Sequence, residues 1–326
     1  MARYLHSIAQ PNTDLVASAD ITPFDLPVNP LSFLLLRFEI DTAAVGAETV
    51  YSAIDDVITQ ISNIRVQHKG EDIIQGSLRD LMILNMIYMR AFPWWSRLAS
   101  PDAEIRSLVF PLCLGRRPYD PVSCFPATTR GNLRFFMTAI GDGAGYSDIN
   151  FSVETVELIE ATPAEYVKYT TNSRDSVDGQ FDQILPIGNP LLGILLFDTG
   201  LRDTAAATYS WGTIKLLKDN VEQYYPLSDI ETLAGMLAMQ MGGMPFWPGH
   251  VHQTLAAIAA GAESAEAEEL GAIGVKGYAY LDFDPLRDGS YQLETAGAAD
   301  LKIRGDGDAA SAVRALPIER RLIAAT

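Results

Sequence analysis

Two histidines late in the chain come nearest to the spacing of a metal site. His250 and His252 form a His-x-His pair, a pattern that metal sites of some β-barrel enzymes use. Such a site also needs a glutamate about four or five positions later and another histidine downstream. The next acidic residue is Glu263, and no histidine follows it. Because a zinc site normally has three or more protein ligands, we interpret the pair as surface or loop residues that bind no metal.

Carboxylates beside glycines are a second candidate for metal binding, because oxygen ligands of this kind suit Ca²⁺. They are Asp142 and the carboxylates of Asp306-Gly307-Asp308. Turn formation explains the same residues, since Gly and Asp both favour turns. We therefore expect Gly-Asp-Gly turns between strands at 141–143 and 305–307.

Other chemical signatures are missing or too short to assign. The sequence has no Gly-x-Ser-x-Gly elbow and no Gly-x-x-x-x-Gly-Lys phosphate loop. Arg304-Gly305-Asp306 spells an integrin-binding tripeptide, but three residues arise readily by chance. Cys113 and Cys124 fit neither a zinc ribbon nor a disulfide framework, and we expect two buried thiols. The sequence thus predicts no catalytic, cofactor-binding or metal-binding residue, and no cofactor.

Two aromatic clusters could stack on sugar rings. They are Phe92-Pro93-Trp94-Trp95 and Phe246-Trp247, which occupy matching places in the two halves of the chain. A matching place favours packing over ligand binding, so we expect these side chains in a core or in a subunit contact.

Composition narrows the class of protein. The 326 residues exceed one usual core and predict about two domains. Asp and Glu outnumber Lys and Arg by 41 to 24, which gives a net charge of −17 and argues against direct nucleic-acid binding. The N-terminal stretch lacks the apolar core of a signal peptide, and no run is long enough to span a bilayer. We expect a protein that stays in the cytoplasm where it is made.

The chain contains an internal repeat, which must be recognised before the fold is assigned. LPVNPLSFLLLRFEIDTAA at 26–44 returns as LPIGNPLLGILLFDTGLRDTAA at 185–206. Asn29-Pro30-Leu31 matches Asn189-Pro190-Leu191, and later blocks match in the same order. In one of them Leu78, Asp80, Leu81 and Leu84 fall on Leu227, Asp229, Ile230 and Leu233. Ordered matches over most of the chain indicate a duplication.

Each copy shows the same local pattern. The apolar run at 31–40 predicts a buried strand. Short strands around a turn follow at 64–74 and 214–225, and each predicts a hairpin. Ser77 with Asp80 and Ser228 with Glu231 then predict the start of a helix of about 12 residues in each copy.

These patterns predict a mainly β protein with two tandem antiparallel jelly-roll sandwiches, each of about 145 residues and carrying one short helix. We expect an N-terminal arm at 1–20, a first jelly roll at 21–165 and a second at 183–326. The polar segment at 166–182 predicts a linker between them.

This layout resembles the double jelly-roll major capsid proteins of tailless icosahedral viruses, especially phages with an internal membrane, and their adenovirus relatives. The resemblance covers roughly residues 21 to 326 and rests on the duplicated sandwich, the hairpin followed by a helix, and closing stretches such as LETAGAADLKIRGDG. It implies a structural protein of the virion, not an enzyme. It also implies homotrimers of hexagonal outline that contact neighbouring capsomers and minor capsid and vertex proteins. Residues 1–20 would tie each trimer to a neighbour or to an internal membrane.

Two other classes contain tandem β domains and remain alternatives. One is a metal-dependent bicupin enzyme, which would use His250 and His252. The other is a tandem sandwich that binds carbohydrate through its aromatic clusters.

Overall fold

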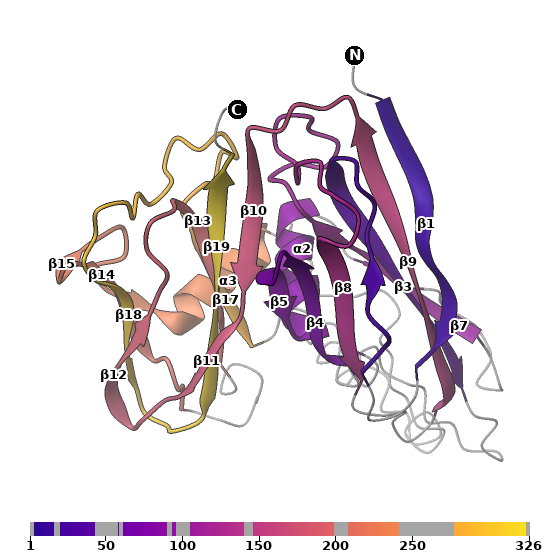
Figure 1. Cartoon of the computed structure of the whole chain (residues 1–326). Helices are drawn as coiled ribbons and strands as arrows, with labels where there is room; N and C mark the ends of the chain where they lie inside the picture. Colours follow the sequence, from indigo (N-terminus) through magenta and orange to yellow (C-terminus); the bar gives the residue numbers. More distant parts are fainter. Residues whose placement is uncertain are drawn as a thin grey trace. The chain divides into compact units, whose positions relative to one another are not determined.

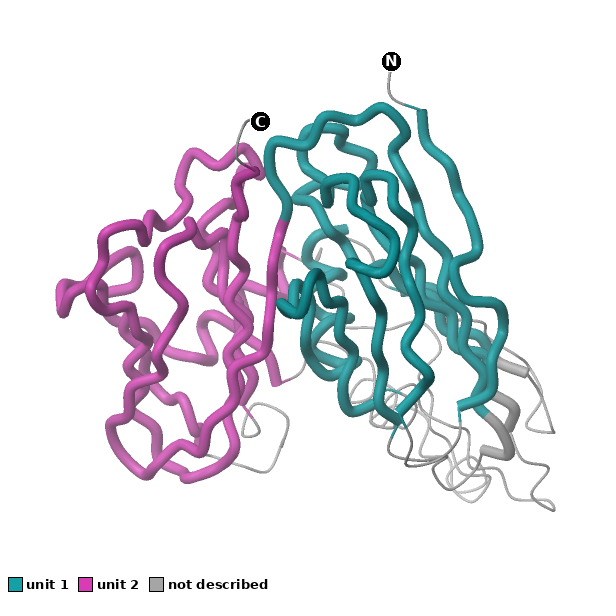
Figure 2. Tube along the Cα trace, viewed as in Figure 1, with its two compact units in different colours: residues 1–166, 245–274 teal, residues 167–244, 275–326 magenta. Residues whose placement is uncertain are grey.

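The structure is a computed structural model that describes residues 3–15, 20–42, 58, 61–89, 93–95, 105–139, 146–198, 208–240 and 277–323 (Figure 1). The chain divides into two compact units (Figure 2). Unit 1 holds the described residues up to Tyr166, and unit 2 holds those from Val167 onward. Both units are built mainly of β-strands.

Unit 1 is built from two groups of antiparallel strands and one helix. The first sheet has the order β1 (Arg3–Asp14), β9 (Tyr146–Ile159), β3 (Leu31–Thr42), β7 (Ile105–Cys113), β6 (Trp94–Trp95). The second group has the order β5 (Glu71–Gly76), β4 (Ile61–His68), β8 (Leu133–Ala139), β2 (Phe24–Asp25). Most neighbours in these orders are distant in sequence, as a jelly roll requires.

The helix of unit 1 closes its core. Helix α2 (Leu78–Met89) packs against β4, β5 and β7, and is buried over almost its whole length. Asn85 fixes the helix to the first sheet, because its buried Oδ1 accepts a hydrogen bond of 2.7 Å from the Cys113 backbone. An apolar helix of this kind is stable only inside a core.

Unit 2 repeats the architecture. One sheet has the order β17 (Tyr278–Asp282), β13 (Leu191–Phe197), β19 (Ala312–Leu322), with β10 (Glu165–Thr170) and β11 (Asn172–Asp175) along β19. The other has the order β12 (Gly179–Ile184), β18 (Leu301–Gly307), β14 (Thr213–Lys218), β15 (Val221–Glu222), and β16 (Ser228–Asp229) pairs with β14. Helix α3 (Ile230–Gln240) packs against β16 and β17. The prediction of two jelly rolls, each with a short helix, is confirmed.

The predicted hairpins turn in the same way in both units. Lys69 and Gly70 join β4 to β5, and Asp219 and Asn220 join β14 to β15. All four residues have positive φ. Two successive left-handed residues match the twist of the flanking strands, and Gly, Asn and Asp adopt that conformation most readily.

The predicted helix start is confirmed in unit 1 and corrected in unit 2. Ser77 Oγ accepts a hydrogen bond of 3.2 Å from the Asp80 backbone, which caps α2. Ser228 belongs instead to β16, and Asp229 Oδ1 accepts the corresponding bond of 2.9 Å from the Glu231 backbone. The side chain next to the first helical residue caps α3, because Ser228 is held in the strand by its pairing with Ile214.

Both segments predicted to lie outside the sandwiches contain strands. Most of the N-terminal segment at 1–20 forms β1, which pairs with β9. The segment at 166–182 contains most of β10, all of β11 and the start of β12. Val167 and Tyr169 are fully buried and alternate with half-buried polar neighbours. The linker prediction rested on polar composition, whereas alternation with a period of two is the pattern of a half-buried strand.

The predicted turn at 305–307 is also a strand. These residues end β18, which pairs with β12 and β14 on its two sides. A Cβ on Gly305 would lie 2.7 Å from the Phe181 ring, and one on Gly307 would lie 2.1 Å from the Ser210 carbonyl oxygen. Glycine is needed here for close approach of neighbouring groups, not for a turn. The segment at 141–143 lies outside the described residues.

Candidate functional site

The predicted metal-site candidates do not come together in the part of the chain that the structure describes. His250, His252 and Asp142 lie outside the described residues. Asp306 and Asp308 are exposed on and just after β18. Among the described residues, no group of three His, Cys, Asp or Glu side chains is placed to hold a metal ion.

The Arg-Gly-Asp tripeptide is part of the sheet of unit 2. Arg304 donates two hydrogen bonds to the Asp182 carboxylate, from Nε at 2.7 Å and from a terminal nitrogen at 3.0 Å. Lys302 Nζ lies 3.3 Å from the same carboxylate. The hydrogen bond from Arg304 is the main cause that lowers the pKa of Asp182. Arg304 thus joins β18 to β12, which is a structural role.

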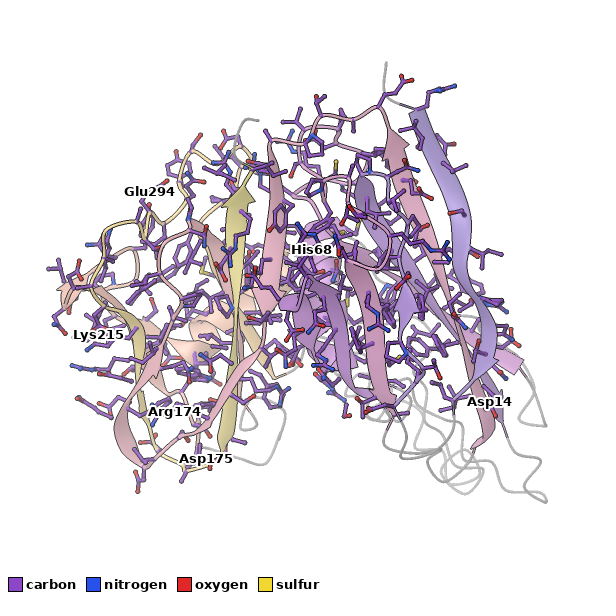
Figure 3. All side chains as sticks on the ribbon, viewed as in Figure 1. Asp14, His68, Arg174, Asp175, Lys215 and Glu294 are labelled. Atoms are coloured by element: carbon purple, nitrogen blue, oxygen red, sulfur yellow. The ribbon has the colours of Figure 1, made fainter. Side chains whose placement is uncertain are left out.

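A shallow hollow of about 630 Å³ opens beside the β14–β15 hairpin. It is lined by Lys215, Leu217, Asn220, Val221, Glu222 and Arg304. The Lys215 amine (Figure 3) donates a hydrogen bond of 3.1 Å to Glu222, and Arg304 is bound to Asp182. The charged groups around the hollow therefore pair with protein groups and do not converge on a ligand.

The repeated Asn-Pro-Leu segment builds the same constellation in both units, which we name the NPL corner. Asn29 Nδ2 donates a hydrogen bond of 2.7 Å to Glu157, and Asn189 Nδ2 donates one of 2.9 Å to Glu319. Both glutamates are buried, on β9 and β19. Each corner leucine is aligned with its glutamate, Leu31 with Glu157 and Leu191 with Glu319.

Backbone hydrogen bonds complete each NPL corner in the same order. The Pro30 carbonyl accepts from the residue after Glu157 at 2.7 Å, and the Pro190 carbonyl accepts from the residue after Glu319 at 2.8 Å. Each corner leucine also exchanges two backbone hydrogen bonds with a distant residue, Leu31 with Phe125 and Leu191 with Leu293. Proline donates no backbone hydrogen bond, so its carbonyl alone joins the ladder. The repeated sequence block is therefore a repeated structural joint.

Besides its asparagine, each corner glutamate contacts a second polar side chain, and this side chain differs between the two corners. In unit 1, Ser7 Oγ on β1 donates a hydrogen bond of 2.9 Å to Glu157. In unit 2, Arg321 Nε lies 3.5 Å from Glu319. The corner of unit 1 thereby ties the N-terminal strand to the sandwich.

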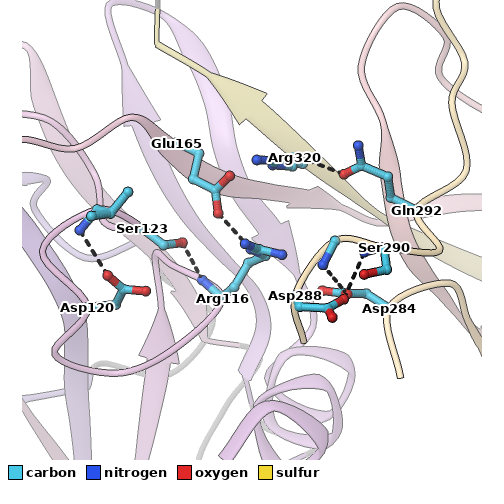
Figure 4. Close-up of polar contacts among 11 residues, drawn as sticks. Arg116, Asp120, Ser123, Glu165, Asp284, Asp288, Ser290, Gln292 and Arg320 are labelled. Atoms are coloured by element: carbon cyan, nitrogen blue, oxygen red, sulfur yellow. Dashed lines mark hydrogen bonds and ion pairs between the residues drawn. The ribbon is translucent and has the colours of Figure 1, made fainter. Parts of the chain in front are cut away.

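Polar contacts also fix two loops (Figure 4). In unit 1, Arg116 Nε lies 2.6 Å from Glu165, and the Arg116 backbone donates to Ser123 Oγ at 2.9 Å. In unit 2, Asp284 Oδ1 accepts a hydrogen bond of 2.7 Å from the Gly289 backbone. These groups hold backbone and neighbouring side chains, as buried polar groups in stable loops do.

The two cysteines are buried, as predicted, whereas Trp94 of the first aromatic cluster is exposed. Cys113 and Cys124 are buried, and burial with a contribution from Asp120 raises the pKa of the Cys124 thiol to about 12. Trp94 is largely exposed on β6 and is therefore not part of the core of unit 1. The side chain of Trp95, and all of Phe92, Phe246 and Trp247, lie outside the described residues.

Sequence reasoning missed the tryptophan at the centre of unit 2. Trp211 is fully buried among the apolar side chains of both sheets. Its indole N–H donates to the Phe197 carbonyl at 3.0 Å, and its backbone N–H donates to buried Asp198 at 2.7 Å. Trp211 has no counterpart in the repeat alignment, so the duplication did not draw attention to it.

Comparison with known proteins identifies the fold. No protein-family model and no curated protein matches the sequence. The major capsid protein P2 of bacteriophage PM2 matches with a TM-score of 0.63 at 11% identity, over 99% of this chain and 98% of that chain. The major capsid protein of Sulfolobus Turreted Icosahedral Virus matches with a TM-score of 0.68 at 12% identity, over 98% and 97%. The capsid of the virus PBCV-1 matches with a TM-score of 0.57 at 11% identity, over 98% and 94%. The chain therefore has the double jelly-roll fold found in the major capsid proteins of icosahedral viruses.

Proposed function

We propose that this chain is the major capsid protein of an icosahedral virus and acts as a structural protein of the virion. The observation that carries the proposal is the pair of NPL corners within a fold whose similarity to viral capsid proteins extends over nearly the full length of both chains. A duplicated sandwich gives one chain two similar building blocks. The polar contacts described above hold the fold together.

The working unit in this proposal is a homotrimer. Most oligomers close by rotation. Three copies of a chain with two similar units place six similar blocks around one axis. Such a trimer has a near-hexagonal outline, and hexagonal outlines tile a flat facet without gaps. Trimers would then contact neighbouring capsomers and the minor capsid and vertex proteins of the shell.

The charge of the chain suits the outer layer of a particle. A net charge of −17 disfavours direct contact with packaged nucleic acid. The N-terminal segment remains the proposed tie to a neighbouring capsomer or to an internal membrane. Within the described residues, none of the helices is long and apolar enough to cross a bilayer.

Native mass spectrometry of capsomers released gently from particles tests the proposal. We expect assemblies of three copies of the 35.6 kDa chain, and negative-stain images of the source particles with icosahedral outlines. A stable dimer, a solitary monomer, or hexagonal units that contain six chains would contradict it.

A further inference from the structure

A segment of the same length joins the NPL corner to the hairpin in each unit. We name residues 125–132 and 293–300 the connecting segments. The first residue of each segment exchanges two backbone hydrogen bonds with its corner leucine. The last residue accepts a backbone hydrogen bond from the first turn residue of the hairpin, at 2.8 Å for Asn132 and 2.9 Å for Asp300. The two segments are therefore equivalent elements of the duplicated fold, and backbone contacts fix both of their ends.

The hairpin also holds each connecting segment through one side chain. The residue before the turn is His68 in unit 1 and Lys218 in unit 2, and each pairs with the first residue of the strand that follows the connecting segment. His68 Nε2 lies 3.3 Å from Thr128 Oγ1. Lys218 Nζ donates a hydrogen bond of 2.7 Å to the Glu294 carbonyl. We name these contacts the His68 clasp and the Lys218 clasp.

The two clasps differ in their chemistry near neutral pH. A lysine ammonium keeps its charge there, because the ordinary pKa of lysine is about 10.4. An imidazole changes its charge between about pH 5 and 8. The same place in the repeat therefore carries a titratable side chain in unit 1 and a permanently charged one in unit 2.

Aromatic side chains cover part of the His68 ring. The centroid of this ring lies 5.3 Å from that of Phe125, and the two planes are nearly perpendicular. Phe125 is fully buried and packs in turn against Tyr166, with ring centroids 5.0 Å apart. These neighbours shield one side of the imidazole from water, and burial of this kind disfavours the charged form.

Among the described residues, two charged side chains act on His68, and both belong to its own hairpin. Lys69 follows it in the chain, and Glu71 lies opposite it across the strand pair. The other elements packed against the ring contribute uncharged residues, such as Leu133 from β8 and Thr128 from the connecting segment. Burial and the Lys69 charge lower the pKa of His68 and outweigh Glu71, which raises it. The neutral ring is the form that the folded unit favours.

We propose that the His68 clasp is a pH-sensitive contact that releases connecting segment 125–132 when the ring is protonated. The imidazolium turns away from Phe125 toward water, which removes the side-chain hold on Thr128. Backbone hydrogen bonds at the ends of the segment remain, so the segment loosens between them while the sandwich stays folded. The Lys218 clasp keeps its charge and its contact. The inference concerns unit 1 of a single chain and does not depend on the proposed trimer.

The direction of the effect follows from the sign of the pKa shift. The pKa of His68 is lower in the folded chain than the ordinary value of 6.5, so the contribution of the clasp is complete above that value. This contribution is lost as the pH falls through the folded pKa. Mild acid should therefore loosen 125–132 and leave 293–300 unchanged.

Hydrogen exchange followed by mass spectrometry tests the clasp at about pH 7.5 and about pH 5. Observed exchange rates are divided by the intrinsic rates at each pH, so that only protection is compared. In the wild-type chain we expect 125–132 to lose protection by about threefold or more in acid, and 293–300 to keep its protection. In His68→Gln, whose side chain is uncharged at both pH values, 125–132 should be equally protected at both. The control is His6→Gln, because His6 is exposed and its contact is with Glu154, so the wild-type response should persist.

Three results of the exchange experiment would overturn the inference. The first is unchanged protection of 125–132 in acid, and the second is an equal loss in both connecting segments. The third is a response of His68→Gln that matches the wild type.

Nuclear magnetic resonance of the wild-type histidine rings adds a measurement that holds even if His68→Gln fails to fold. The chain has four histidines, so four rings titrate. One of them should have a midpoint below about 6.5, and this midpoint should coincide with the loss of protection in 125–132. A loss of protection whose midpoint matches none of the four rings would contradict the clasp.

Discussion

Removal of the asparagine from an NPL corner should destabilise the unit that contains it. The variants are Asn29→Ala in unit 1 and Asn189→Ala in unit 2. Each deletes the amide that donates to a buried glutamate, at 2.7 Å and 2.9 Å respectively. Water cannot replace the amide freely, because only 4% of Glu157 and 5% of Glu319 is exposed.

The magnitude follows from the partners that remain. A hydrogen bond to a charged group contributes about 1.5 to 3 kcal/mol, and a buried group that loses its partner carries a further desolvation penalty. Glu157 keeps the Ser7 hydroxyl, whereas Glu319 keeps the Arg321 guanidinium at 3.5 Å. We therefore expect Asn29→Ala to lower the free energy of unfolding by about 3 kcal/mol and Asn189→Ala by about 2 kcal/mol.

Urea unfolding of the purified chain, followed by tryptophan fluorescence and circular dichroism, measures both effects. Asn12→Ala is the matched control, because Asn12 donates at 3.5 Å to Glu39 on an exposed surface. It should change the free energy of unfolding by less than about 0.5 kcal/mol. Loss of less than about 0.5 kcal/mol in both corner variants would show that the repeated hydrogen bond does not support the fold.

Three further predictions concern a pair of glycines, Asp182 and Cys124. Gly307→Ala should destabilise unit 2 by about 2 kcal/mol or more, because its Cβ would lie 2.1 Å from a backbone oxygen. Gly235→Ala should stabilise unit 2 by about 0.5 to 1 kcal/mol, because the added Cβ in α3 meets open space. Thermal melts of both variants and the wild type measure the two effects. The lowered pKa of Asp182 stabilises the fold above the unfolded value of about 4, and that stabilisation is lost as the pH falls through the lower folded pKa. Asp182→Asn should flatten acid unfolding curves there, and a profile identical to wild type would disprove this. Cys124, with a pKa of about 12, should resist iodoacetamide at pH 8 until urea unfolds unit 1, and mass spectrometry of native protein would reveal any early reaction.

The duplication was predictable from the sequence because similar blocks recur in the same order. The type of each local element was predictable because it depends on neighbouring residues. The apolar run of β3, the turn residues of the β4–β5 hairpin and the Ser77 cap act over a few positions. Their preferences are set by burial, backbone conformation and one capping bond. The repeated Asn-Pro-Leu block likewise marked a joint, although its partner could not be identified.

Several assignments depended on contacts between distant residues and were inaccessible to the sequence. Gly305 and Gly307 have the composition of a turn, and only the packing of Phe181 and Ser210 against β18 explains them as strand glycines. The polar residues of β11 form a strand because β19 supplies hydrogen-bond partners for them. Such hydrogen-bond and packing partners can lie at any distance along the chain, so local residue patterns do not reveal them.

The sequence by itself determined that the chain repeats, that it is mainly β, and that each copy carries a hairpin followed by a short helix. The tertiary structure decided which carboxylate each corner asparagine binds. It also decided which of two equivalent apolar side chains is buried. Leu78 and Leu227 are the same residue at the same place in the repeat, yet one is buried and the other is exposed. Burial depends on what lies against a side chain in three dimensions, and residue type and spacing do not contain that information.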